Sequence, residues 1–394
     1  MSNLTDFFGA GAAPIPTAQF VIGESKTFTS PLTGRIKVII TGGGGQGAFV
    51  ANSNQYPNQN YGDGTGGGAG GYSEKIFNVI AGDTFTVTIG AGGATTLAMD
   101  SISSTRVGNN GGNTTFVTAS AAESVNMTAN GGGGGQIQSG ANTSAYTVAG
   151  GVGGTASGGD FNYTGGAGGS ITRIASNNAN AMTTGGGAVA LYGSAYRGGN
   201  IDISLDLSGY YLIGATGGAG VGGNGGDIDF NVLEHRAAIS SGGSATKSAD
   251  SYIGSRSIST TLPSTSGGPT NNPTISIIDA QGSGSGGKYA YNASLSQTNS
   301  GGFGAGSGAG AGYNVNRTAH LYCRVYGGGG FGGGGACNYI NDTTSSATGG
   351  HYAGAGGTGG GGSGAFNSKF HNLSGLTDRR WSPGGDGLCI IMFV

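Results

Sequence analysis

Arg35-Ile36-Lys37-Val38-Ile39-Ile40-Thr41-Gly42-Gly43-Gly44-Gly45 joins an apolar, β-branched run directly to four consecutive glycines. The first seven residues are typical of a β-strand, because β-branched side chains fit a pleated surface. The glycines bring no side chain to bury and lose more backbone freedom on folding than any other residue. The fold therefore depends on what such glycine runs do.

Glycine runs recur along nearly the whole chain, and 92 of the 394 residues are glycine. Further runs are Gly131–Gly135, Gly327–Gly330, Gly332–Gly335 and Gly359–Gly362. A collagen helix is excluded, because it needs glycine at every third position and abundant proline, whereas proline totals only 8 here. Plain disorder fits poorly too, since the chain is 36% hydrophobic and contains 17 Tyr and 15 Phe.

The remaining ordered structure for these runs is a left-handed extended helix of the polyproline type built from glycine. Such a helix has no internal hydrogen bonds, so its N–H and C=O groups must bond to neighbouring runs or to water. Only glycine lets several backbones approach that closely. The alternative is that the runs are flexible loops between ordinary strands. The sequence leaves open whether the runs pack within one chain or between chains.

Further β-strands are predicted on both sides of the glycine runs, and little or no helix is expected. Predicted strands lie at 72–79, 84–90, 114–117, 125–129 and 388–394, with a turn at Gly82-Asp83. The C-terminal strand Leu388–Val394 is continuously apolar and needs cover on both faces, so its expected partner is the equally apolar Ile36–Ile40. Asn231–Ile239 is compatible with either a short helix or a strand.

These elements predict a mostly β fold, in which a small β-sandwich closed by N- and C-terminal strands accompanies polyglycine-II-like segments. Residues 1–25 are expected to form an attachment peptide or linker. Residues 26–130 with 383–394 are expected to form the sandwich. Residues 131–382 are the glycine-rich region with aromatic and polar loops, and their irregular spacing excludes a simple solenoid.

Charge and targeting signals exclude several classes of partner. Charged residues make up only 9% of the chain and the net charge is −2, so neither a basic footprint for nucleic acid nor a cluster for anionic lipid is present. Met1–Phe8 lacks the positive start and apolar core of a secretion signal, and no apolar stretch is long enough to span a bilayer. We expect synthesis and folding in a cytosol. Cys323, Cys337 and Cys389 form no metal-ligand spacing and are expected to be unpaired thiols.

The order of motifs resembles the glycine-rich tail fibre proteins of bacteriophages. The resemblance rests on the run into Gly42–Gly45, on Gly67–Tyr72, on Ala81–Gly93, on Gly111–Phe116 and on the ending Pro383–Leu388 before Cys389-Ile390-Ile391. It covers about 26–135 and 383–394. It implies a distal fibre or adhesin component of a virion, made in the host cytoplasm, with loops that contact a host receptor. Related fibres are commonly homotrimers, but tip adhesins can be monomeric, so the resemblance does not fix the oligomeric state.

Signals for catalysis or cofactor binding are weak. Gly62–Gly67 formally satisfies the dinucleotide-binding spacing, but chance matches are expected at this glycine frequency. A glycan depolymerase would need two carboxylates about 5–10 Å apart, and the closest clustered aspartates in the middle region are Asp202/Asp206 and Asp227/Asp229. Turn-capping or solubilising aspartates are the simpler interpretation. We expect no enzyme, no cofactor and no metal site.

The segments between glycine runs carry the best functional signal, because they concentrate Tyr, Asn and Gln, which stack on sugar rings or hydrogen-bond their hydroxyls. The candidate receptor-binding residues are Phe49, Gln55, Tyr56, Asn58, Tyr61, Tyr192, Tyr196, Tyr313, Tyr339 and Tyr352. Binding residues usually lie on loops held by a rigid scaffold. The alternative is that these aromatic side chains cap the glycine bundle or fill a subunit interface.

The sequence thus predicts a non-enzymatic virion protein that attaches to other virion proteins through its N-terminal residues and binds a host surface receptor, either a glycan or an outer-membrane component. The alternative is a purely structural coat, filament or capsid-fibre protein, and a depolymerase is the third reading. No nucleic acid and no membrane insertion are expected.

Overall fold

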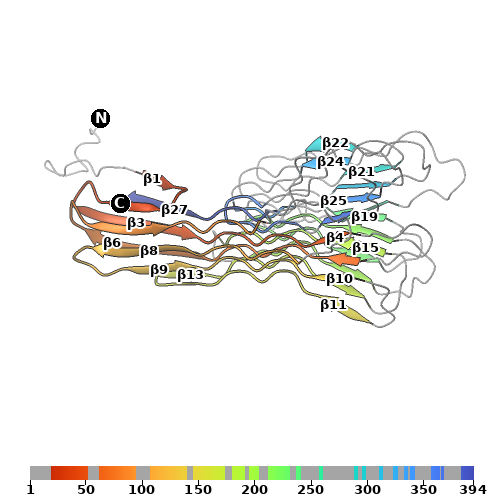
Figure 1. The fold of residues 1–394 in the computed structure, drawn as a ribbon, viewed down its shortest axis with the longest axis horizontal. Coiled ribbons are helices and arrows are strands. Elements are labelled where there is room, and N and C mark those ends of the chain that lie inside the picture. Colours follow the sequence, from red (N-terminus) through yellow and green to blue (C-terminus); the bar gives the residue numbers. More distant parts are fainter. Residues whose placement is uncertain are drawn as a thin grey trace, which may run out of the picture.

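The structure of the protein is a computed structural model. The structure describes residues 19–51, 62–94, 107–139, 145–173, 180–190, 195–203, 212–230, 237–240, 257–260, 288–291, 295–298, 310–313, 323–326, 332–335, 338–341, 356–363, 365–367 and 383–394. All regular elements in these residues are β-strands. The molecule is elongated, with a β-sandwich at one end, short strands at the other and glycine runs between them (Figure 1).

Two five-stranded sheets form the sandwich. Sheet A has the order β1 (Gln19–Ile22), β27 (Leu388–Phe393), β3 (Gly34–Thr41), β6 (Tyr72–Val79) and β13 (Phe161–Tyr163). Sheet B has the order β12 (Ala156–Ser157), β9 (Asn126–Ala129), β8 (Thr114–Ser120), β7 (Thr84–Thr88) and β2 (Lys26–Thr29). All pairs within these two sheets are antiparallel.

The sandwich core consists of the alternate residues that face inward from both sheets, as period-two strands require. Phe77, Phe85 and Phe116 form its aromatic centre, with the Phe85 and Phe116 rings stacked at 4.8 Å between centroids. β27 lies between β1 and β3, and Ile391 pairs with Val38. The predicted pairing of the C-terminal strand with Ile36–Ile40 is therefore confirmed. The predicted turn is also present, and Gly82 has a φ of 98°, which favours glycine.

Sheet membership extends beyond the range that the sequence predicted for the sandwich. β1 belongs to sheet A, although residues 19–22 lie in the stretch predicted as attachment peptide or linker. β12 and β13, from the predicted glycine-rich region, complete sheets B and A. Each of these three strands has four residues or fewer. An alternation of apolar and polar residues over so short a stretch cannot be recognised in the sequence.

Glycine runs between the two ends form a hydrogen-bonded bundle, named the glycine bundle here. Consecutive N–H groups of one run donate to different neighbouring runs. The four bonds are Gly42 N–H to Gly71 O (3.0 Å), Gly43 N–H to Gly112 O (3.0 Å), Gly44 N–H to Gly385 O (2.8 Å) and Gly45 N–H to Gly68 O (2.7 Å). The fourth donor thus returns to the run that received the first. A repeat of three residues is that of a polyglycine-II helix. The prediction of polyglycine-II-like segments is confirmed, and the runs pack within one chain.

The bundle is too tight for side chains at its interior positions. A Cβ added at Gly44, Gly67 or Gly134 would lie within 3.0 Å of the carbonyl oxygen of a neighbouring run. Runs at the periphery instead carry a larger residue at every third position. Ala149, Val152 and Thr155 are exposed, whereas Gly151 and Gly154 between them are buried. Glycine therefore occupies the positions that face the interior of the glycine bundle, and larger residues occupy positions at its surface.

The opposite end, named the far end here, contains short and mainly parallel strands. Sheet C has the order β21 (Lys288–Tyr291), β23 (Gly310–Tyr313), β25 (Asn338–Asn341), β26 (Ala365–Asn367) and β4 (Phe49–Ala51). Sheet D has the order β10 (Ile137–Ser139), β5 (Gly62–Gly64), β15 (Asn180–Thr183), β17 (Leu212–Ala215), β19 (Ala237–Ser240) and β20 (Ser257–Thr260). Sheet E has the order β11 (Tyr146–Val148), β14 (Ile171–Arg173), β16 (Ile201–Ile203) and β18 (Ile228–Phe230), and β22 (Leu295–Thr298) pairs with β24 (Cys323–Tyr326).

The segment Asn231–Ile239, for which the sequence allowed a helix or a strand, is a strand in its described part. β19 covers its last three residues and runs parallel to β17. Residues 231–236 lie outside the described residues.

Candidate functional site

The structure describes four of the ten predicted receptor-binding residues. Phe49, at the start of β4, is only 7% exposed, so its ring belongs to the packed scaffold. Tyr196 is half-buried and packs against a small cluster of Ala188, Ala219 and Val221. Tyr313 belongs to strand β23 and Tyr339 to strand β25, and the structure describes only the backbone of these two residues. The remaining six, Gln55, Tyr56, Asn58, Tyr61, Tyr192 and Tyr352, lie outside the described residues.

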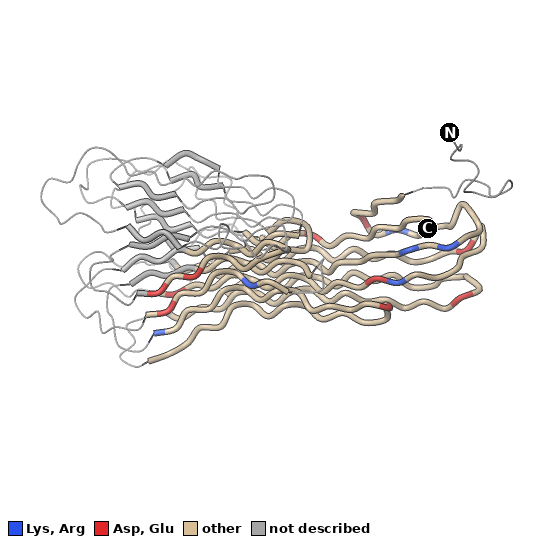
Figure 2. The backbone as a smooth tube through the Cα atoms, turned by 180° about the vertical axis from the view of Figure 1, so that it is seen from behind, with Lys and Arg blue, Asp and Glu red and all other residues tan. Residues whose placement is uncertain are grey.

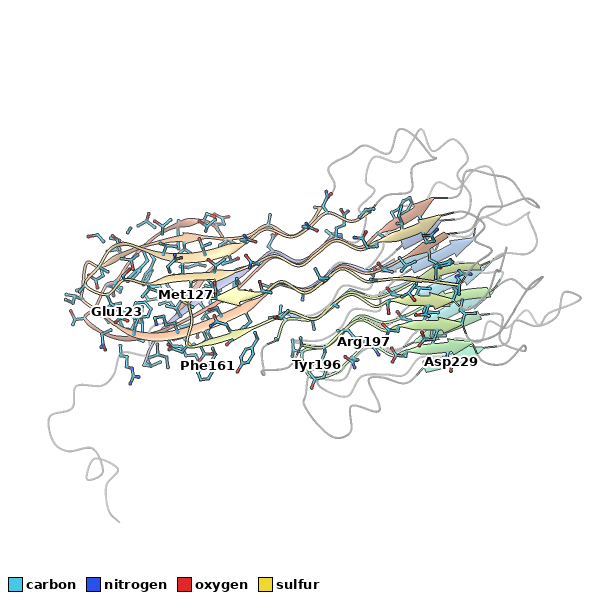
Figure 3. All side chains as sticks on the ribbon, turned by 90° about the horizontal axis from the view of Figure 1, so that it is seen from below. Glu123, Met127, Phe161, Tyr196, Arg197 and Asp229 are labelled. Atoms are coloured by element: carbon cyan, nitrogen blue, oxygen red, sulfur yellow. The ribbon has the colours of Figure 1, made fainter. Side chains whose placement is uncertain are left out.

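The elements around these residues meet at the far end. Sheet C brings β4, β23 and β25 together, so Phe49, Tyr313 and Tyr339 belong to one sheet. β4 ends at Ala51 and β5 begins at Gly62, and both strands lie at the far end (Figure 1). Tyr196 lies instead in the glycine bundle, nearer the sandwich than Asp229 (Figure 3).

A buried ionic cluster joins sheets D and E at this end. Arg173 of β14 forms a two-pronged salt bridge with Asp63 of β5, donating from Nε to Oδ2 (2.8 Å) and from Nη2 to Oδ1. The hydroxyl of Tyr146 in β11 donates to Asp63 Oδ2 (2.7 Å), and the guanidinium lies over the Tyr146 ring. The two charged side chains are at most 3% exposed.

Burial and charge act together on the pKa values in this cluster. Desolvation and the neighbouring Asp63 carboxylate raise the pKa of Tyr146, so its hydroxyl stays protonated and remains a donor. Burial opposes the charge on Arg173, but the Asp63 carboxylate outweighs it and raises the Arg173 pKa. Asp63 therefore has three donors for its two oxygens, which satisfies a carboxylate that is removed from water.

The aspartates that the sequence suggested as possible catalytic pairs, Asp202/Asp206 and Asp227/Asp229, do not lie together in those pairs in the described residues. Asp227 is held by Arg197, whose Nη1 and Nη2 donate to its two oxygens at 2.6 and 2.8 Å, and it also accepts from Asn200 N–H. Asp202 and Asp229 are the neighbours, in register on the parallel strands β16 and β18. Asp206 lies outside the described residues.

Among the described residues, charged residues lie mostly toward the two ends of the elongated molecule, and the glycine bundle between them contains few (Figure 2). Among the described residues, no group of three or more His, Cys, Asp and Glu side chains gathers to hold a metal ion. No helix that could cross a membrane occurs in that part of the chain. Cys389 is a free, fully buried thiol in β27.

A family model described as a glycine-rich domain matches residues 21–229, more than half of the chain. The chain belongs to the glycine-rich domain family. The glycine-rich domain begins within β1 and ends within β18, so it includes most of the sandwich and the Asp63–Arg173–Tyr146 cluster. Tyr313, Tyr339 and Tyr352 lie beyond it. A search of curated proteins found no match.

Sequence reasoning missed the ionic cluster of the glycine-rich domain, because Asp63, Tyr146 and Arg173 are far apart in the chain. An aspartate between glycines, as in Gly62-Asp63-Gly64, was no sufficient signal, because Gly385-Asp386-Gly387 repeats the pattern and Asp386 is exposed. The formal dinucleotide spacing at Gly62–Gly67 has a structural explanation, since these residues form β5 and enter the glycine bundle.

Proposed function

We propose that this protein is a virion-associated tail fibre or tip protein that binds a host cell-surface receptor, a glycan or an outer-membrane component, through segments at the far end. The observation that carries the proposal is the separation of the two ends. The strands β4 and β5, which flank residues 52–61, lie opposite the sandwich that contains the N-terminal strand β1 and the C-terminal strand β27 (Figure 1).

The glycine bundle supports this proposal as a scaffold. Its runs are cross-linked by backbone hydrogen bonds in several directions, so the strands that leave it have fixed starting positions. Segments held in this way lose less conformational entropy on binding than free loops do. Binding residues on a rigid scaffold can also vary without disturbing a core.

The mechanism that we propose is many weak contacts rather than a single pocket. Tyr56 and Tyr61 stack on sugar rings, and Gln55 and Asn58 hydrogen-bond to sugar hydroxyls. Several copies on one particle convert weak contacts into useful avidity. This mechanism involves no catalysis and needs no cofactor.

We assign attachment to other virion proteins to the sandwich end and the N-terminal residues. The outer face of sheet A supports this assignment, because Val21, Ile390 and Ile39 are cross-strand neighbours there and Val21 is 61% exposed. The row continues to Glu74, which forms a salt bridge with Lys37 on the same face, so the face combines an apolar cluster with one ion pair. On the outer face of sheet B, Thr27 and Thr86 are exposed cross-strand partners, and the row continues to Val117 and Asn126. Apolar side chains that cluster on an outer face are a candidate interaction surface.

The same apolar face favours a second candidate, a structural coat or filament protein whose copies contact one another. Phe161, at the edge of sheet A, is 54% exposed and could be covered by a neighbouring copy. In that case, binding to a host would not depend on Tyr56 or Tyr61.

The experiment that separates the two candidates measures binding of the purified, fluorescently labelled full chain to cells of susceptible bacterial strains. We expect Tyr56→Ala and Tyr61→Ala each to weaken binding by about tenfold, taking as the scale the about 1–3 kcal/mol that an aromatic ring contributes when a nucleic-acid base stacks on it. Phe161→Ala is the matched control, because it removes an exposed aromatic ring at the opposite end. Unchanged binding by both tyrosine variants, together with loss of self-association by Phe161→Ala, would support the coat protein instead.

A further inference from the structure

Asparagine and aspartate have a recurring place in this chain, directly after two glycines. The sequence Gly-Gly-Asn or Gly-Gly-Asp occurs six times, and all six copies lie in the described residues. The residues that end these six copies are Asn113, Asp160, Asn200, Asn224, Asp227 and Asp386. Each of their side chains accepts a hydrogen bond from the backbone N–H of a residue at least 18 positions away, over N···O distances of 2.7–3.0 Å.

The run 131–135 shows what such a side chain replaces. Gly132 N–H and Gly133 N–H donate to carbonyl groups of two neighbouring runs, so two of the three directions of the polyglycine-II repeat are used by backbone. Gly131 N–H, which points in the third direction, donates to Asn113 Oδ1 (3.0 Å). Asn113 is exposed, so this direction lies at the surface of the bundle. The side-chain oxygen supplies the acceptor that another run supplies in the interior.

The runs that lead into sheet E are connected in the same way. In each connection, one residue donates its N–H to an Asn or Asp side chain, and its C=O accepts from the N–H of the residue that follows this Asn or Asp. The connected residues are Ser170 with Asn200 and Ile201, Arg197 with Asn224 and Gly225, and Asn200 with Asp227 and Ile228. Neighbouring runs are thus joined at both backbone groups directly before β14, β16 and β18 begin.

The order of residues in the motif follows from the three-residue repeat. A Cβ added at Gly198 or Gly199 would lie within 3.0 Å of the carbonyl oxygen of a neighbouring run, so these two positions face the interior. The third position faces the surface and admits a side chain, and five of the six residues at this position are exposed. Asn and Asp both carry an oxygen acceptor on a short side chain, so either residue type can bond to the adjacent run.

We propose that Gly-Gly-Asn and Gly-Gly-Asp mark lateral ties, in which the Asn or Asp oxygen takes the place of a missing run and binds a surface run to its neighbour. Asn200, Asn224 and Asp227 are then positioning residues, because they join the runs from which the strands of sheet E begin. This role is independent of receptor binding, since none of the six tie residues is among the proposed receptor contacts.

The test measures amide hydrogen exchange by NMR on the full chain labelled with 15N-serine and 15N-arginine. Asn224→Ala should speed exchange of the Arg197 amide by about tenfold, because one hydrogen bond is lost, and leave the Ser170 amide unchanged. Asn200→Ala should do the reverse, so each variant is the matched control of the other. Asn78→Ala should change neither amide, because Asn78 is exposed in β6 and its side chain accepts no backbone N–H among the described residues.

Asn224→Asp separates a tie from a general effect of substitution. Its carboxylate accepts the same N–H, as that of Asp227 does for Asn200, so the Arg197 amide should exchange at the wild-type rate. Three results would overturn the lateral ties: an unchanged Arg197 amide in Asn224→Ala, a faster rate that extends equally to Ser170, or equal loss of protection in the Ala and Asp variants. If one alanine variant does not fold, the other decides by the same criteria.

Discussion

At the scale of single residues, the interior glycines are fixed by the carbonyl groups that face them. Gly44→Ala would bring a Cβ within 3.0 Å of the Gly360 carbonyl oxygen. Backbone cannot move aside as a flexible side chain can, so we expect a loss of about 3 kcal/mol in the free energy of unfolding. Chemical denaturation measures it. Gly23→Ala is the control, since no atom lies within 4 Å of its added Cβ, and it should change stability by less than about 0.5 kcal/mol. An equal loss of unfolding free energy in Gly44→Ala and Gly23→Ala would contradict the close packing of the glycine bundle.

Buried threonines at the ends of the bundle differ in whether their hydroxyl is used. Thr184 Oγ1 accepts from Gly66 N–H (3.0 Å) and donates to Gly169 O (2.6 Å), whereas Thr41 Oγ1 has no hydrogen-bond partner among the described residues. Removing an unsatisfied hydroxyl should help and removing a satisfied one should harm. We therefore predict that Thr41→Val leaves the free energy of unfolding unchanged or raises it by about 1 kcal/mol, and that Thr184→Val lowers it by about 1–3 kcal/mol. Thermal unfolding measures both variants. A Thr41→Val protein that is less stable than the Thr184→Val protein would contradict the hydrogen bonding assigned to the two hydroxyls.

At the scale of elements, β27 lies between β1 and β3 in sheet A and contains a buried thiol, Cys389, whose ionisation reports on the packing of this strand. Burial raises the pKa of Cys389 to about 12. The unfolded chain releases this proton near its ordinary pKa and the folded chain does not, so the stabilising effect is complete below about pH 8.5 and is lost as the pH rises through about 12. The difference in unfolding free energy between the wild type and Cys389→Val should shift against the wild type by about 1.4 kcal/mol per pH unit in this window. A difference that does not change with pH would mean that the thiol is not shielded. Both proteins are compared in a background without Cys323 and Cys337.

The elements that could be predicted from sequence are those with a side-chain pattern. The strands that became β3, β6, β7, β8, β9 and β27 all alternate apolar residues or run continuously apolar. One pairing, that of β27 with β3, followed from the need of the C-terminal strand for cover on both faces. β1 was missed because four residues before a glycine look like a linker. The packing of glycine runs within one chain could not be predicted, since backbone hydrogen bonds between runs have no side-chain signature. The same holds for the site: Phe49 and Tyr196 looked like loop aromatics, and only the fold shows how far they are buried.

At the scale of the whole molecule, the bundle closes within one chain, so folding should not require other copies. The N–H groups of Gly42–Gly45, Gly67 and Gly68, for example, all find acceptors in other glycine runs of the same chain. We predict that the unfolding midpoint of the purified chain stays constant from low to high micromolar concentration, because an obligate oligomer would instead gain stability with concentration. Association of copies, including a homotrimer, would then use outer surfaces such as the apolar face of sheet A. A midpoint that rises with concentration would show that the chain depends on its neighbours.

The most direct test of the proposed function is a cryo-EM map of the assembled particle into which the chain is fitted. We predict that the sandwich faces the particle and that the far end, with β4 and β5, points into solvent and away from other copies. A far end buried between copies, or a chain that is attached by that end, would contradict receptor binding there and would favour a structural coat or filament protein.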